Sequence, residues 1–71
     1  MFADFRQNIK KLLKGKDMTY AQIAEQAGIE ESTVKSFMCG ANDSRRVAEK
    51  IADALGVKLE YSNGVYTVVE N

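Results

Sequence analysis

The sequence predicts a mainly α fold in which four helices are followed by a C-terminal β-hairpin. Up to Leu55, apolar residues recur at helical spacing in four separate blocks. From Val57 onward the spacing changes to strict alternation, and Asn63-Gly64 interrupts the alternating run as in a tight hairpin turn. We therefore expect one domain over residues 1–71, with helices at about 2–14, 19–26, 30–38 and 44–55 and a hairpin at about 57–69.

The first helix is expected from large apolar side chains at the spacing of one helix face: Phe2, Phe5, Ile9, Leu12 and Leu13. Gly15 is expected just beyond its end. Lysines near that end suit the negative pole of the helix dipole. A solvated face and a phosphate-binding surface both remain open as readings of Lys10, Lys11 and Lys14.

Two short helices joined by a tight turn are predicted within TYAQIAEQAGIEESTVKSFMCG, residues 19–40. The Thr19 hydroxyl can cap the first of them, and Gln22, three residues on, can return the bond in a capping box. Gly28 can adopt the left-handed conformation that ends a helix, because it has no Cβ. The start of the first helix and the turn after it are therefore both predicted from local sequence.

The fourth helix and the hairpin are also predicted from local signals. Ser44 or Asp43 can cap the helix, and Gly56 lies at its end. In the hairpin, a two-residue turn places Tyr61 opposite Tyr66 and gathers the large apolar side chains on one face. Because an isolated hairpin is marginally stable in water, this one must lie on the helices, on a second copy of itself, or on both.

Composition argues against several classes of protein. No stretch approaches the roughly 20 apolar residues of a membrane span, and the N-terminal segment is charged throughout, so we expect a cytoplasmic protein with no membrane partner. The chain has one cysteine, Cys39, and no histidine, so neither a metal site nor a cofactor is expected. Glu30 and Glu31 are adjacent and point in different directions on a helix, and Cys39 lacks a base, so we do not expect an enzyme.

The stretch AQIAEQAGIEESTVKSFMCG resembles the helix-turn-helix of the lambda-repressor and Cro family of DNA-binding regulators, also called XRE-type. The lead-in LLKGKDMT and the later segment RRVAEKIADALGV resemble the helices on either side of that motif in the family. The resemblance implies a four-helix lambda-repressor-like domain that binds double-stranded DNA. It also implies a phage or bacterial transcriptional regulator, expected to be a repressor, that acts as a homodimer on a palindromic operator.

The family places the second helix of its motif in the major groove, N-terminus first. The resemblance therefore implies that outward residues of this helix read base edges: Glu31, Ser32, Lys35 and Ser36. Residues around them are expected to contact phosphate: Lys16, Tyr20, Thr33, Asn42, Ser44, Arg45 and Arg46. Tyr20 departs from the family pattern, in which glutamine is usual at that position.

Dimerisation is expected through the hairpin, which offers a second partly apolar face and an open edge. The residues expected at the interface are Leu59, Tyr61, Val65, Tyr66, Val68 and Val69.

The formal charge is zero, which is unusual for a protein that binds nucleic acid. Basic residues are nevertheless concentrated near the N-terminus and after the helix-turn-helix, and such a polarised surface can attract DNA. Glu30 and Glu31, at the end of the helix expected to enter the groove, bring negative charge toward phosphate. These features keep a second class open: a protein-interaction module on the same fold, such as an antitoxin or a phage-encoded inhibitor, in which DNA binding is secondary or lost.

Overall fold

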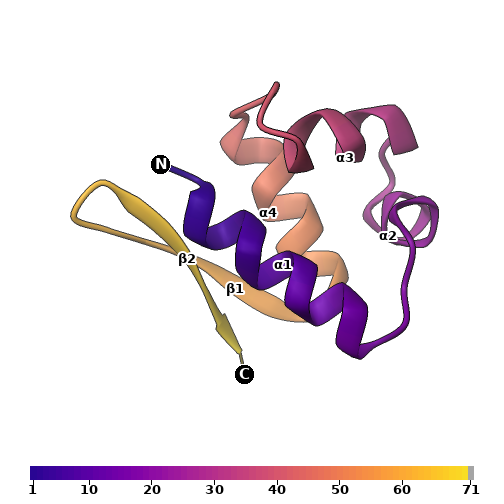
Figure 1. The fold of residues 1–71 in the computed structure, drawn as a ribbon, viewed down its shortest axis with the longest axis horizontal. Helices are drawn as coiled ribbons and strands as arrows, with labels where there is room; N and C mark the ends of the chain where they lie inside the picture. The colour runs from indigo at the N-terminus through magenta and orange to yellow at the C-terminus, as the bar shows by residue number, and fades with distance from the viewer. Residues whose placement is uncertain (71) are drawn as a thin grey trace.

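The computed structural model describes residues 1–70 as four helices followed by a two-stranded antiparallel hairpin (Figure 1), so the predicted fold class is confirmed. The elements are α1 (Ala3–Gly15), α2 (Tyr20–Ala27), α3 (Glu31–Met38), α4 (Arg45–Ala54), β1 (Val57–Ser62) and β2 (Val65–Glu70). None of the helices in this described part of the chain combines the length and apolarity needed to cross a membrane.

The end of α1 differs from the prediction. Gly15 is the last residue of the helix and does not lie beyond it, and Lys16 is the C-cap. The chain turns at Asp17, whose φ is 55°. There the Asp17 amide donates to the Lys14 carbonyl at 3.2 Å and the Met18 amide donates to the Leu13 carbonyl at 2.9 Å. This is the pattern of a Schellman motif, with aspartate where glycine is usual.

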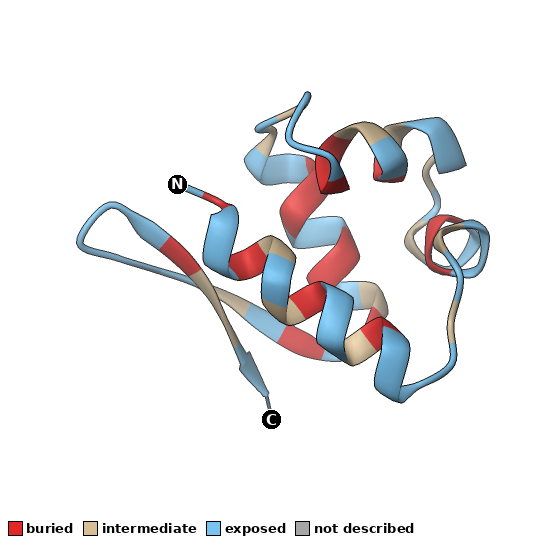
Figure 2. Cartoon of the chain, viewed as in Figure 1, coloured by how far each residue is buried: buried red, intermediate tan, exposed pale blue. Residues whose placement is uncertain are grey.

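Buried side chains from every helix and from the hairpin form one core (Figure 2). Aromatic rings tie together segments that are far apart in sequence. The Phe2 ring stacks on the Tyr66 ring with centroids 4.3 Å apart and planes 7° from parallel. Phe5 and Phe37 meet edge to face at 5.8 Å. Because such pairs add about 0.5–1.5 kcal/mol each beyond the area they bury, these rings hold the N-terminus, α3 and β2 together.

The hairpin has the predicted turn. Asn63 and Gly64 both have positive φ, 52° and 79°, as a type I′ turn requires. Tyr61 pairs with Tyr66 as predicted from the two-residue turn.

The inner face of the hairpin lies against the helices, which narrows the surface available to a partner. Tyr66 is buried, and Leu59 and Val68 are half-buried against the core. These three side chains, expected at a dimer interface, are therefore used largely by the chain's own core. The exposed members of that expected set are Tyr61, Val65 and Val69.

Candidate nucleic-acid interface

The crossed pair of α2 and α3 is fixed at its start and at its turn by the signals predicted from sequence. The Thr19 hydroxyl accepts from the Gln22 amide at 3.2 Å, and the Thr19 amide donates to Gln22 Oε1 at 2.9 Å, which completes the capping box. Gly28 ends α2 with a φ of 72°. The Ile29 amide then donates to the Ala24 carbonyl at 3.0 Å, which closes the turn. In Figure 1, α2 is seen end-on, whereas α3 lies above it and is seen from the side.

The third helix has one buried face and one free face. Its buried side chains are Val34, Phe37 and Met38. Glu31, Ser32 and Lys35 are exposed, whereas Thr33 and Ser36 are half-buried at the border between the two faces. Of the four residues expected to read bases, Ser36 is thus the least accessible.

Two of those residues pair with each other. Lys35 Nζ lies 2.9 Å from Glu31 Oε2, one helical turn away, and 61% and 45% of the two side chains is exposed. Exposed pairs at this spacing contribute only about 0.3–0.5 kcal/mol, so DNA can separate them at little cost. The pair nevertheless neutralises the lysine in the free protein. The four-residue spacing of Glu31 and Lys35 on a helix is the sequence signal that indicates this pair.

Arg6, which the sequence analysis did not single out, connects α1 to the end of α3. Its Nε donates to the Phe37 carbonyl at 2.5 Å. Its Nη2 donates to the Asn42 carbonyl at 2.9 Å and to the Asp43 carboxylate at 2.7 Å. The loop between α3 and α4, which contains expected phosphate contacts, is therefore held in place from the first helix. No local signal predicts this, because its partners lie 31 to 37 residues away.

Asn42 and Ser44 shape this loop. The Asn42 side-chain oxygen accepts from the Ser44 amide at 2.8 Å. The Ser44 hydroxyl accepts from the Val47 amide at 3.4 Å and so caps α4, which resolves the choice between Ser44 and Asp43. The side-chain NH2 group of Asn42 and the Ser44 hydroxyl proton donate to no acceptor within residues 1–70. Both can therefore donate to a phosphate.

The two arginines that open α4 differ in their surroundings. Arg45 Nε lies 3.1 Å from the Glu49 carboxylate, and its guanidinium is 6.0 Å from the centre of the Tyr66 ring. Arg45 is thus turned toward the hairpin. Arg46 is exposed and makes no ion pair within the described residues. Of the two, Arg46 is the better placed to meet a phosphate.

The other expected contacts lie before and at the start of α2. Lys16 is exposed and has no ion-pair partner in the part of the chain that the structure describes. Tyr20 is half-buried and packs against the core, so only part of its ring and its hydroxyl can face a ligand.

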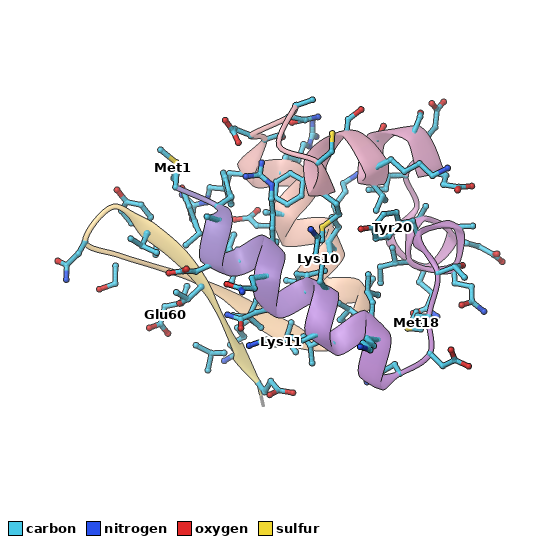
Figure 3. All side chains as sticks on the ribbon, viewed as in Figure 1. Met1, Lys10, Lys11, Met18, Tyr20 and Glu60 are labelled. Carbon is cyan, nitrogen blue, oxygen red and sulfur yellow. The ribbon has the colours of Figure 1, made fainter. Side chains whose placement is uncertain are left out.

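The lysines of α1 do not form a single patch. Lys10 lines an open hollow with Arg6 and Met38 at the end of α3, whereas Lys11 lines a different hollow with Val68 on β2. Figure 3 shows the two lysines on different sides of α1. Only the Lys10 side of α1 therefore adjoins the α3 end of the molecule.

Comparison with protein-family models matches residues 8–60 to the Cro/C1-type HTH DNA-binding domain, where HTH stands for helix-turn-helix. The match covers more than half of the chain and includes α2, α3 and α4. Searches of curated proteins and of solved structures give no match.

Proposed function

The chain belongs to the Cro/C1-type helix-turn-helix DNA-binding family, and on this premise we propose that it is a phage or bacterial transcriptional repressor that binds a palindromic operator as a homodimer. The family consists of DNA-binding domains and is not catalytic. Repression follows when the bound dimer occludes a promoter.

The observation that carries this proposal is the free outer face of α3. Val34, Phe37 and Met38 hold the helix on the core from one side, and no element of the described chain covers the opposite side. That side presents the kinds of group that recognise base edges in the major groove. The Lys35 amino group can donate to guanine, the Ser32 hydroxyl can donate or accept, and the Glu31 carboxylate can accept from cytosine.

Groups on either side of α3 support contact with the phosphate backbone of DNA. The N-terminus of α2 and the loop from Asn42 to Arg46 supply free donors and cations at the two ends of the motif. Phosphate contacts of this kind position a recognition helix and set the dependence of affinity on salt. Half-buried Tyr20 and Thr33 remain proposed contacts made by their hydroxyl groups.

A homodimer is the form that a palindromic site selects, since each half-site receives one recognition helix and the half-sites lie about one helical turn, roughly 34–36 Å, apart. The hairpin supports this part of the proposal because it carries exposed Tyr61, Val65 and Val69.

The test is selection from a random pool of duplex DNA at low and at moderate salt. We expect an inverted repeat to be enriched at both salt concentrations. Recovery of sequences without any preference, with affinity lost at moderate salt, would contradict sequence-specific regulation. That outcome would favour the protein-interaction module, to which the zero net charge also points.

A further inference from the structure

The two outer edges of the hairpin differ in what covers them. The Tyr66 amide donates to the Met1 carbonyl at 3.0 Å and so points away from β1. The N-terminal segment therefore covers the outer edge of β2 at this position, and Figure 3 shows Met1 beside the hairpin. Tyr61 lies directly opposite Tyr66. Opposed residues in antiparallel strands either exchange both main-chain bonds or exchange neither, so the Tyr61 amide and carbonyl also point outward, away from β2.

This alternation identifies the free groups on β1. Outward and inward positions repeat every two residues along a strand, so Leu59 shares the orientation of Tyr61, whereas Lys58 and Glu60 bond to β2. Within residues 1–70 no bond uses the outward groups of Leu59 or Tyr61. An edge strand with free donors and acceptors is a template for another strand.

We propose that β1 pairs antiparallel with β1 of a second copy of this chain, so that two hairpins form one four-stranded sheet. The inference rests on the homodimer of the proposed function and names its interface. The chain offers no other strand whose free edge could be symmetrically matched, since β2 is covered at Tyr66 by the N-terminal segment in the described structure.

The charges of β1 select one register. The outward groups lie at odd-numbered positions, so a symmetric pairing must place one odd-numbered residue opposite another. With Leu59 opposite Leu59 of the partner subunit, Lys58 lies opposite Glu60 of the partner subunit, and this pair occurs twice. If the symmetric pairing is centred on residue 58 instead, two copies of Lys58 lie directly opposite each other. If it is centred on residue 60, two copies of Glu60 lie directly opposite each other. Opposite charges favour a cross-strand pair and like charges oppose it, so the Leu59-centred register is preferred.

The surroundings of β1 leave room for this strand. An open hollow, lined by residues of α4 and by Lys58 and Leu59, flanks β1. The hairpin lies at one side of the helices (Figure 1), and Figure 3 shows Glu60 on the side facing away from α1. Tyr61, which is 55% exposed, would lie opposite Val57 of the partner subunit and lose contact with water. The interface thus combines main-chain bonds with burial of one of the largest exposed apolar side chains.

The register is tested by exchanging charges between two copies. Lys58→Glu and Glu60→Lys each place like charges opposite each other in the homodimer. Each variant alone should therefore self-associate about tenfold more weakly than the parent chain. An equimolar mixture of the two variants should recover the parental association. In the mixed dimer, one copy carries two negative charges at positions 58 and 60, and the other carries two positive charges opposite them. The double variant K58E/E60K should dimerise like the parent. Sedimentation equilibrium measures all four samples, and a mixture no tighter than its components would overturn the register.

A second pair of variants tests the strand edge itself. Tyr61→Pro removes an outward amide that the hairpin does not use, and Pro is tolerated at such edge positions. Tyr61→Thr removes the same ring but keeps the amide. We expect the proline variant to be monomeric and the threonine variant to retain measurable dimer, with circular dichroism showing both folded. Equal dimerisation of the two variants would place the interface elsewhere.

The result is separable from the DNA-binding proposal. If the parent chain selects an inverted repeat from random DNA and the charge variants dimerise as well as the parent, the β1 interface is wrong and the proposed function stands. If the parent chain remains monomeric at every concentration and selects no inverted repeat, the proposed dimer fails, and the β1 interface fails with it.

Discussion

Arg6 lies at the C-terminal end of α3 although it belongs to the first turns of α1: its Nε donates to the Phe37 carbonyl at 2.5 Å, and its guanidinium carbon is 4.7 Å from the centre of the Phe37 ring. The last carbonyls of a helix lack partners within the helix, and a cation there also meets the negative pole of its dipole. The same guanidinium holds Asn42 and Asp43 of the next loop. The position of α3 therefore depends on a side chain outside the helix-turn-helix.

We predict that Arg6→Ala lowers the free energy of unfolding by roughly 2–3 kcal/mol, because it removes charge-assisted bonds and leaves the part-buried Asn42 carbonyl without its donor. Urea denaturation followed by circular dichroism measures the change. Asp43→Asn is the matched control: it removes the ion pair at a carboxylate that is 69% exposed, so we expect a loss below about 1 kcal/mol. Equal losses in the two variants would show that the carbonyl contacts contribute nothing.

Substitution of Gly28 and of Gly15 by alanine should have opposite effects on stability. A Cβ built at either position meets nothing within 4 Å, so only the backbone conformation distinguishes them. At Gly28, with φ at 72°, alanine should destabilise the protein by about 1–2 kcal/mol. At Gly15, which ends α1 within the helix, alanine should stabilise it by about 0.5–1 kcal/mol. Thermal melting should show shifts of opposite sign, and shifts of the same sign would contradict the assigned conformations.

The features predicted correctly from sequence are those whose partners are neighbours in the chain. The Thr19 and Gln22 capping box and the Asn63-Gly64 turn are complete within four residues, so the sequence contains both partners in one short window. The turn also fixes the pairing of the two strands, since it leaves one register for the residues on either side.

The features that could not be predicted from sequence depend on contacts between distant residues or on a residue type that rarely adopts the observed backbone conformation. Burial of Tyr66 follows from stacking on Phe2, which lies at the other end of the chain, so the sequence alone left open whether the hairpin packs on the helices, on a second copy, or on both. Gly15 was expected beyond the end of α1, but the helix includes it and the chain turns at Asp17, because aspartate tolerates the left-handed conformation. In the candidate interface, Glu31, Ser32 and Lys35 are exposed as predicted and Ser36 is half-buried, whereas the contacts of these residues with DNA remain predictions.

We predict that Arg46→Ala reduces the slope of log affinity against log salt by about one unit, because one phosphate contact is lost. Arg45→Ala should reduce it less, since Arg45 is already paired with Glu49 and turned toward the hairpin. Titrations of labelled duplex at several salt concentrations give both slopes. If the Arg45 variant shows the larger change, the side chain must leave Glu49 when DNA binds.

Ser32, Lys35 and Ser36 are predicted to set sequence preference. Substituting each by alanine should relax the preferred sequence, because a lost base contact is worth about 1–3 kcal/mol of discrimination. The melting temperature should barely change for Ser32 and Lys35, which are exposed. Selection from random DNA with each variant measures the effect, and an unchanged preference in all three would exclude these three side chains from base recognition.

The final prediction concerns Glu31, whose carboxylate lies 2.9 Å from Lys35 Nζ and adds negative charge to the face of α3 that is proposed to enter the groove. Glu31→Gln should strengthen binding to every duplex, because it removes a negative charge near the groove and frees the lysine to donate to guanine. Glu30→Gln is the matched control: it removes a neighbouring charge, but Glu30 contacts Ser32 and not Lys35. The gain for Glu31→Gln should therefore exceed the gain for Glu30→Gln. If Glu31 instead reads a cytosine, its variant should gain affinity on random duplex and lose it on the selected operator, so measuring both variants on both DNAs separates the two roles of this carboxylate.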